Sequence, residues 1–377
     1  MRASRSIPAT LFALVTCALA SAADAQRGAM TDTTTRAVDR VFDAWRSTDS
    51  PGCALGVSRN GRVVYERGYG MANLETGTPI SPSSIFHVAS VSKQFTAMAI
   101  MLLAREGKLS VDDNIRKYLP EIPDYGTPIT IRHLLTHTSG LRDQWELLSL
   151  ARGRFEEDRI TEADVMDIVP RQTALNFTPG ADVYLAGSLA LAATEVTPQG
   201  VTLSSERLQR RAGVYVQPRT MQIVELLVRD GRLMLGRQGT VTLTPVSEDR
   251  MRISGQPGEA VFTDAAASAF DLTPVGGRPL RFERRPSVVV TPQLLASYAG
   301  DYVSDELAGA VYRVTSTDST IALRTGTSTP VTARLVFADT FLGGGYTIQF
   351  TRSRGQVTGF EVTNGRIRHV KFVRRKP

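Results

Sequence analysis

The chain has 377 residues, 42% of them hydrophobic and 21% charged, with a formal net charge of +7 at pH 7. More than 300 residues supply enough buried area for two or more domains. The charge is uneven, because residues 201–377 hold 24 Lys and Arg against 15 Asp and Glu. No aromatic and basic recognition module accompanies this basic half, which excludes a nucleic-acid partner from our expectations.

Residues 1–25 predict a secretory signal that is removed after its last residue. Its parts are the basic residues Arg2 and Arg5, the apolar run Ile7–Ala20 and the cleavage site Ala23-Asp24-Ala25. The alternative is an N-terminal membrane anchor, but the apolar run is too short to span a bilayer. Leu14–Cys17 is a faint lipoprotein site, to which Thr16 is a poor fit. We expect a periplasmic or extracellular protein with no later membrane helix.

Beyond the predicted signal the chain has one cysteine, Cys53, and therefore no internal disulfide. No cluster of Cys and His has metal-ligand spacing, and the four histidines do not pair as ligands. We therefore expect neither a metal nor another cofactor.

The first predicted elements are a helix and a hairpin. Residues 26–50 read as a polar lead-in followed by a helix, in which Val38, Val41, Phe42 and Trp45 recur at helical spacing. Ala54–Ser58 and Val63–Tyr69 are strand-like, and the dipeptide Asn60-Gly61 between them is a strong hairpin signal.

Helical patterns follow the hairpin. Ser90–Glu106 predicts a helix with Gly107 at its C-terminal cap. Its apolar positions are Val91, Phe95, Met98, Leu102 and Leu103. Thr130 is a suitable N-cap for a short helix through His137. The charged stretch 143–170 also reads as helical.

From about residue 205 the pattern changes to short β runs that repeat. Arg211–Tyr215 matches Tyr298–Tyr302 at an offset of 87, and Phe282–Arg285 matches Phe372–Arg375 at an offset of 90. The alternating runs between these marks are Ile223–Val228, Leu233–Leu235 and Val241–Leu243 in the first copy and Val311–Val314, Ile321–Leu323 and Tyr346–Phe350 in the second. They predict two antiparallel sheets of similar plan, each curled into a barrel or half-barrel and linked by Val288–Pro292. Whether they make one barrel or two stays open.

The basic residues concentrate in Arg366–Lys376. The preferred interpretation is a solvated final strand and tail, and the alternative is contact with an anion or an envelope surface.

The run Ser90-Val91-Ser92-Lys93 carries the candidate chemistry. A serine hydroxyl is a poor nucleophile until a base takes its proton, and a lysine one helical turn later can reach it. The lysine acts as a base only where burial or a nearby cation keeps it neutral. On spacing alone, an ordinary N-cap serine and a surface lysine are the favoured interpretation, because caps are far commoner than nucleophiles.

The surrounding sequence resembles the serine hydrolases of the β-lactamase and D-alanyl-D-alanine peptidase group, in particular the class C β-lactamase and esterase branch. The matching stretches are Pro51–Val57, Gly68–Leu74, Ile85–Ala97, Glu106–Asp113 and Ile129–Leu141. The resemblance implies Ser90 as the acylated nucleophile and Lys93 as its base or proton relay. It also implies that His133 and His137 are structural.

Two further motifs of that group are missing from the sequence. No Tyr-x-Asn occurs, the only Ser-x-Asn is Ser58-Arg59-Asn60 in the predicted hairpin turn, and there is no Lys-x-Gly or His-x-Gly. Phe177–Gly180 resembles the segment that precedes Tyr-x-Asn in the group. The following Tyr184-Leu185-Ala186 is either a decayed Tyr-x-Asn or part of a last helix, and we favour the helix. On that interpretation about half of the hydrolase domain is absent after Gly180.

These observations predict an α+β chain: a shortened β-lactamase-like α/β domain at 26–195, then a lipocalin-like antiparallel β module with repeats at 205–286 and 287–377. The first functional hypothesis is an exported serine hydrolase that acts on an amide or ester, in a small molecule or peptide, through an acyl-serine intermediate and with impaired turnover. The alternative is a non-catalytic binding or assembly protein that works through the β module, with an envelope surface or a second copy as partner. The third is an internally deleted product with no selected function.

Overall fold

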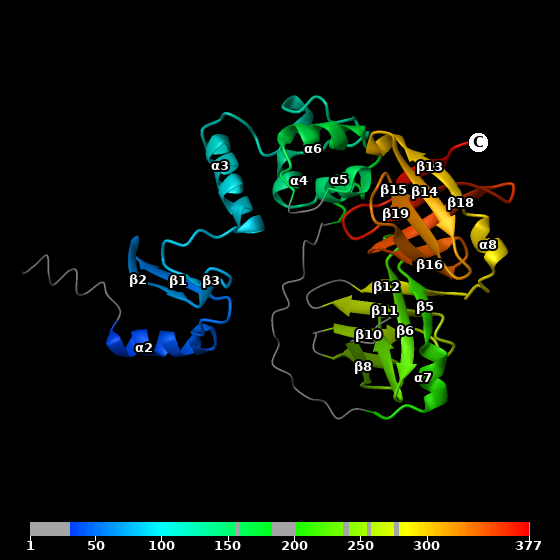
Figure 1. Ribbon diagram of the computed structural model, residues 1–377, viewed down its shortest axis with the longest axis horizontal. Helices are drawn as coiled ribbons and strands as arrows, with labels where there is room; N and C mark the ends of the chain where they lie inside the picture. Colours follow the sequence, from blue (N-terminus) through cyan, green and yellow to red (C-terminus); the bar gives the residue numbers. More distant parts are fainter. Residues whose placement is uncertain are drawn as a thin grey trace, which may run out of the picture. The chain divides into compact units, whose positions relative to one another are not determined.

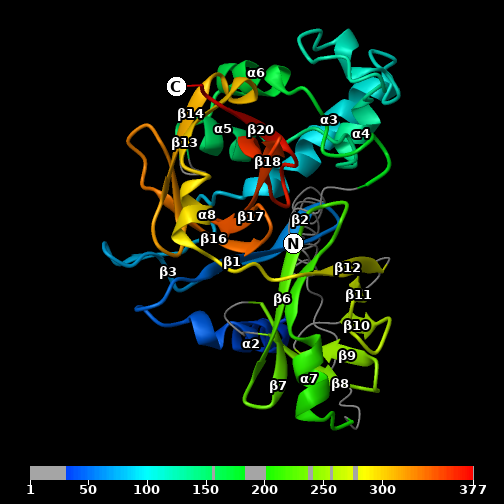
Figure 2. The ribbon, with the colours of Figure 1, turned by 90° about the vertical axis from the view of Figure 1, so that its right-hand side faces the viewer.

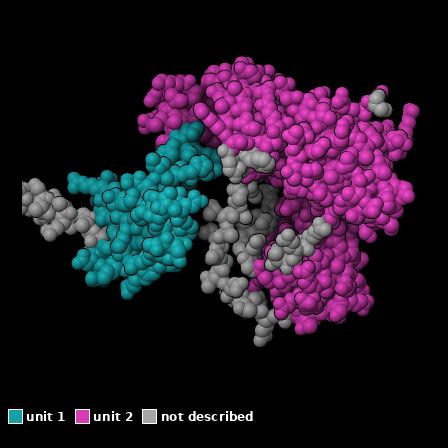
Figure 3. Space-filling view, in the orientation of Figure 1, with its two compact units in different colours: residues 1–96 teal, residues 97–377 magenta. Residues whose placement is uncertain are grey.

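The computed structural model describes residues 31–154, 158–182, 201–236, 241–254, 258–274 and 279–376. The chain divides into two compact units, residues 1–96 and 97–377, which Figure 3 colours separately. Among the described residues, no helix is long and apolar enough to cross a membrane. The predicted signal segment and Tyr184-Leu185-Ala186 lie outside the described residues.

The first unit contains a short helix and a hairpin. Its elements are α2 (Asp32–Val41), η1 (Asp43–Trp45), β1 (Cys53–Arg59), β2 (Arg62–Tyr69), β3 (Met71–Asn73), β4 (Thr78–Pro79) and η2 (Ala89–Ser92), after which α3 (Lys93–Arg105) begins. β1 and β2 pair antiparallel, as predicted. Asn60 and Gly61 have φ values of 51° and 75°, the positive pair that a two-residue hairpin turn requires.

A buried carboxylate fastens the helix to the hairpin. Asp39 of α2 is 7% exposed and accepts hydrogen bonds from the hydroxyls of Tyr65 and Tyr69, both at 2.7 Å. Arg67 donates a third at 2.6 Å. These tyrosine hydrogen bonds, with Arg67 and Arg46 nearby, hold the pKa of the Asp39 carboxyl below its ordinary value. The predicted helix is confirmed, but its buried contact is polar: Val41 and Trp45, expected on the inner face, are 69% and 44% exposed.

Short helices open the second unit. They are η3 (Ile115–Lys117), α4 (Ile131–Leu135), α5 (Gln144–Arg152), α6 (Glu162–Ile168) and η4 (Val169–Arg171), followed later by α7 (Ser205–Arg211) and α8 (Pro292–Ala296). Thr130 caps α4 as predicted, although the helix ends at Leu135 and not at His137. The stretch 143–170 forms two helices, α5 and α6, whose side-chain caps are Asp143 and Thr161.

Two closed barrels of eight antiparallel strands each follow (Figures 1 and 2). The first is β5 (Gly213–Val216), β6 (Ile223–Arg229), β7 (Arg232–Leu235), β8 (Val241–Pro245), β9 (Arg250–Ile253), β10 (Gly258–Phe262), β11 (Ala269–Pro274) and β12 (Leu280–Arg285). The second is β13 (Gly300–Ser304), β14 (Ala310–Ser316), β15 (Ile321–Thr325), β16 (Val331–Phe337), β17 (Thr340–Gly343), β18 (Tyr346–Ser353), β19 (Gln356–Thr363) and β20 (Val370–Arg374), with η5 (Asp305–Leu307) after its first strand. The predicted fold class is confirmed, and the open question is answered as two barrels.

The sequence repeat corresponds to a repeated aromatic core. In the first barrel Tyr215 meets Phe270 edge-on at 5.0 Å, and Phe270 stacks on Phe282. In the second barrel Tyr302 meets Phe360 at 5.0 Å, and Phe360 stacks on Phe372. All six rings are at most 2% exposed. Side chains therefore fill both interiors, as in other small closed barrels.

The repeated glycine and arginine close each barrel. Gly213 and Gly300 begin their first strands with φ values of 154° and 152°. The guanidinium groups of Arg284 and Arg374, from the last strands, lie against them and donate to the carbonyls of the preceding Ala212 and Ala299.

The basic run Arg366–Lys376 is the closing strand of the second barrel and its flanks. Val370 and Phe372 are 0% and 2% exposed, while the outward Val373 is 61% exposed. This run is thus solvated on one face only.

Candidate active site

Ser90 lies in the 3₁₀ turn η2, and Lys93 begins α3 directly after it. Three-residue spacing places both side chains on the same side of this turn. The Lys93 Nζ donates a hydrogen bond to the Ser90 Oγ at 3.0 Å. The predicted nucleophile and its predicted base are therefore in direct contact.

The residue before the nucleophile has an uncommon backbone conformation. Ala89 has φ 43°, in the left-handed region that non-glycine residues seldom adopt. Such conformations raise the energy by about 1–3 kcal/mol and cluster at functional sites. This conformation lies directly before Ser90, the predicted nucleophile.

The surroundings of the pair are open. Ser90 and Lys93 are both exposed, and no residue of α3 is buried. Phe95 and Met98, which the sequence places on the packed face of this helix, are 69% and 61% exposed. The arrangement supplies a nucleophile and an amine in contact on an exposed turn.

The last stretch of the resemblance, Ile129–Leu141, is hydrogen-bonded to residues 176–180 in the second unit. The Gly180 N–H donates to the Thr138 carbonyl at 2.9 Å, and the Asn176 N–H donates to the Gly140 carbonyl at 2.7 Å. His133 accepts a hydrogen bond from the Thr130 N–H at its Nδ1, which completes the N-terminal cap of α4. This contact gives His133 a structural part, as the resemblance implies.

Two buried charged groups of the second unit escaped the sequence analysis. Arg142 and Glu306 form an ion pair at 2.8 Å with side chains only 1% and 6% exposed. Nothing in the local sequence separates them from surface charges, since their partners lie 164 residues apart. Among the described residues, no group of three or more His, Cys, Asp or Glu could hold a metal ion.

Comparison with known proteins gives these contacts a family context. The β-lactamase family model matches residues 32–203, which include the contacting Ser90 and Lys93. These residues form a β-lactamase family domain. It belongs to the same group of serine hydrolases and penicillin-binding proteins that the sequence motifs indicate.

The β-lactamase domain has relatives with diverse names. Esterase EstB of Burkholderia gladioli is 40% identical over 110 residues, which cover 28% of this chain and 28% of the esterase. A penicillin-binding protein of Bacillus subtilis is 42% identical over 86 residues, 23% of this chain and 19% of the relative. The human mitochondrial serine β-lactamase-like protein LACTB is 36% identical over 98 residues, 25% of this chain and 18% of the relative. The matches thus span less than a third of each relative's length.

Solved structures resemble the chain only loosely. The hydrolase EstCE1, which has promiscuous acyltransferase activity, is 28% identical over 38% of this chain and 40% of its own, with a TM-score of 0.32. The octameric penicillin-binding protein homologue from Pyrococcus abyssi is 15% identical over 91% of this chain and its whole length, with a TM-score of 0.33. Scores this low carry no argument about fold or assembly.

Proposed function

We propose that this chain is an exported serine hydrolase that acts on a small-molecule or peptide amide or ester through an acyl-Ser90 intermediate. The observation that carries the proposal is the 3.0 Å hydrogen bond from the Lys93 Nζ to the Ser90 Oγ inside a β-lactamase family domain. The Ser90 Oγ would attack the substrate carbonyl as its proton passes toward Lys93. The bond to the leaving amine or alcohol would then break, and water would release the acyl group.

We expect turnover by this site to be impaired. The sequence holds no Tyr-x-Asn and no Lys-x-Gly or His-x-Gly, so neither the second proton relay nor the second oxyanion donor is evident. A general acid or base contributes about 10²–10⁴ to rate, and an oxyanion donor about 10²–10³. These factors do not simply multiply, because such groups act as a unit. Acylation of Ser90 is therefore easier to detect than steady hydrolysis.

A fluorophosphonate probe tests the nucleophile. Wild type and Ser90→Ala are compared, with Ser92→Ala as the matched control from the same turn. We expect wild type and Ser92→Ala to be labelled and Ser90→Ala to stay unlabelled. Equal labelling of wild type and Ser90→Ala, or no labelling at all, would contradict the proposal. With a chromogenic ester, we expect a burst of about one equivalent followed by slow release.

Export depends on the predicted signal in residues 1–25. N-terminal sequencing of the protein recovered from the periplasm or medium should begin at Gln26. A chain that retains its first 25 residues in the cytoplasm would contradict export.

The second candidate function is non-catalytic binding or assembly through the two barrels. Two observations favour it: the half of the chain that holds the barrels has 24 Lys and Arg against 15 Asp and Glu, and Ser90 is exposed. Because aromatic side chains fill both interiors, the outer surfaces would carry the contact with an envelope surface or a second copy. Full-length Ser90→Ala should then bind anionic vesicles as wild type does, with a salt-dependent affinity. Absence of binding to such vesicles, together with a monomeric mass, would exclude this candidate.

A further inference from the structure

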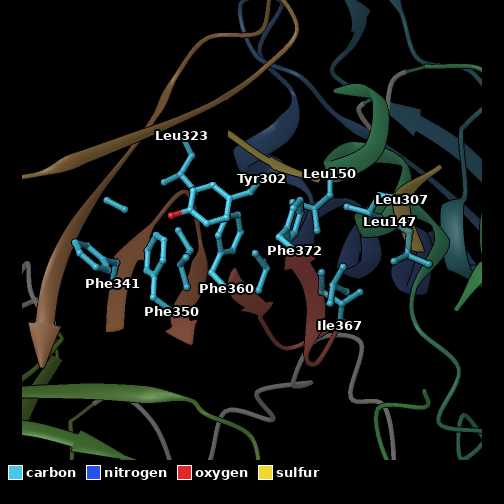
Figure 4. Close-up of a cluster of buried hydrophobic side chains, with 14 of the residues drawn as sticks. Leu147, Leu150, Tyr302, Leu307, Leu323, Phe341, Phe350, Phe360, Ile367 and Phe372 are labelled. Atoms are coloured by element: carbon cyan, nitrogen blue, oxygen red, sulfur yellow. The ribbon is translucent and has the colours of Figure 1, made fainter. Parts of the chain in front are cut away.

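The second barrel shares its hydrophobic core with the helices that precede both barrels. One continuous cluster of buried side chains includes Leu147 and Leu150 of α5 together with Leu307, Ile367 and Phe372 of the second barrel (Figure 4). α5 also contacts η5 and β14, and η4 contacts η5. The first barrel instead has a core cluster of its own, formed by residues 203–282. The second barrel, although it is farther along the chain, thus completes the hydrophobic core of the helices.

A buried polar network joins the same two parts. The Arg142 Nη1 donates to the Glu306 Oε1 at 2.8 Å and to the Gln172 Oε1 at 2.7 Å. The other guanidinium nitrogens of Arg142 donate to the carbonyls of Arg368 and His369, both at 3.0 Å.

The Glu306 carboxylate likewise accepts hydrogen bonds from the helical segment and from the second barrel. Its Oε1 accepts from the Thr173 hydroxyl at 2.6 Å and from the Thr173 N–H at 3.0 Å, and its Oε2 accepts from the Lys371 N–H at 3.0 Å. Burial would raise the pKa of Glu306, but the Thr173 hydroxyl, Arg142 and these N–H groups together hold it below its ordinary value. Each group in this pair therefore depends on residues from the helical segment and from the barrel together.

Further hydrogen bonds cross the same boundary. The Tyr346 hydroxyl of β18 donates to the Glu146 Oε2 at 2.6 Å, and the Tyr312 hydroxyl of β14 donates to the Leu150 carbonyl at 2.8 Å. The Asn176 side chain donates to the Arg366 carbonyl at 2.9 Å. Hydrogen bonds at several places therefore join the helical segment to the second barrel, in addition to the shared apolar core.

The first barrel has a smaller attachment. Among the described residues, it meets the second barrel through a cluster of three buried residues, Val216, Val336 and Phe337, and through the ion pair of Glu225 with Arg334. Four partly buried hydrophobic residues pack against this cluster: Val214, Met221, Ile223 and Leu342. The turns after the first strands correspond, since Met221 and Ala308 have φ values of 55° and 54° at an offset of 87. In the second barrel this turn carries Glu306 and joins the helices. In the first barrel it lies at the junction between barrels, where the Met221 carbonyl accepts from Thr347.

We propose that residues 115–182 and the second barrel form one cooperative folding unit clamped by the Arg142–Glu306 pair, and that the first barrel opens independently of it. The helical half of the β-lactamase domain then depends on the C-terminal barrel for its stability. The first barrel, which follows the helical segment directly in the sequence, does not contribute to that stability.

Hydrogen exchange of the full-length protein tests this. Glu306→Gln removes the charge opposite Arg142 while keeping the side-chain volume. Removal of one partner of a buried pair corresponds to an opening about 10²–10⁴ times more frequent. We expect exchange to accelerate by that factor in α5 and α6 and in β13, β14 and β20, and to stay unchanged in β5–β12. The matched control, Glu225→Gln, breaks the ion pair between the barrels and should leave α5 and α6 at wild-type rates.

The proposal is overturned if Glu306→Gln accelerates exchange in the second barrel but not in α5 and α6. It is equally overturned if the first barrel accelerates to the same extent, or if Glu225→Gln alters α5 and α6. Should Glu306→Gln fail to fold, Tyr346→Phe removes a single bond across the boundary. It should accelerate α5 and β18 together by about tenfold.

Discussion

The Arg142–Glu306 pair predicts that Glu306→Gln affects stability differently in wild type and in the Arg142→Met variant. Glu306→Gln alone leaves the Arg142 guanidinium buried opposite a neutral side chain, in a position where it is 1% exposed. Arg142→Met alone leaves the Glu306 carboxylate buried without its cation. Made after Arg142→Met, the substitution Glu306→Gln removes an uncompensated buried charge instead of creating one.

The magnitudes follow from the burial of the pair. Loss of one partner from a buried, hydrogen-bonded ion pair costs about 3–5 kcal/mol, mostly because the remaining charge is unpaired. Glu306→Gln should therefore lower the free energy of unfolding by about that amount in wild type. In the Arg142→Met background it should be neutral or stabilising, because it removes the unpaired buried charge. Its one amide oxygen can replace only one of the two carboxylate oxygens, Oε1, which accepts from the Thr173 N–H, or Oε2, which accepts from the Lys371 N–H. The coupling energy of the cycle is then at least about 3 kcal/mol.

Trp145 of α5 provides the signal for this cycle. The chain has two tryptophans, so a Trp45→Phe background leaves Trp145 as the single reporter of the helical segment. Urea unfolding of the four proteins in this background gives the coupling energy directly. If Glu306→Gln destabilises both backgrounds equally, the two charges are not coupled and the reasoning is refuted.

Three further outcomes are expected. In the folded protein the pKa of Glu306 lies below its ordinary value of 4.5. Its contribution to the free energy of unfolding is therefore complete above pH 4.5 and is lost as the pH falls through the folded pKa. The acid unfolding curve measured by Trp145 fluorescence should accordingly be displaced by Glu306→Gln. Asp39→Ala leaves the hydroxyls of two tyrosines without an acceptor, and limited trypsin digestion should cut within α2 earlier than in wild type. Gly300→Ala places a Cβ 3.0 Å from the Arg374 Nε at φ 152°, which should lower the unfolding free energy by about 1–3 kcal/mol in urea titrations, while Gly365→Ala, with nothing within 4 Å, should change little.

Short sequence patterns predicted the structural elements whose conformation depends on residues close together in the chain. The dipeptide Asn60-Gly61 predicted the hairpin turn because few other residues adopt two positive φ values in succession. The repeat of Gly-x-Tyr and Phe-x-Arg predicted two similar sheets because each barrel is closed by the same contact between its first and last strands. Three-residue spacing also allows the contact of Ser90 with Lys93, which the structure contains.

Contacts between distant residues could not be predicted in the same way. The spacing of apolar residues predicts that Val38 and Val41 face the interior, and it does not predict a buried Asp39 beside them. Only the tyrosines 26 and 30 residues later explain the burial of Asp39. The exposure of Phe95 shows the opposite error, since helical periodicity predicts an apolar face but not whether anything covers it.

The order of contacts has a consequence for how the chain folds. The helical segment is complete in sequence by residue 182, but Glu306 lies 164 residues beyond Arg142. Loop closure over that distance must come before the shared core forms, whereas the first barrel gains its core from residues 203–282 alone. During synthesis the first barrel can therefore fold while α5 still exposes Leu147 and Leu150. On the proposed coupling, the helical half of the β-lactamase domain becomes stable only when the last strand, β20, closes the second barrel and buries Phe372 against α5.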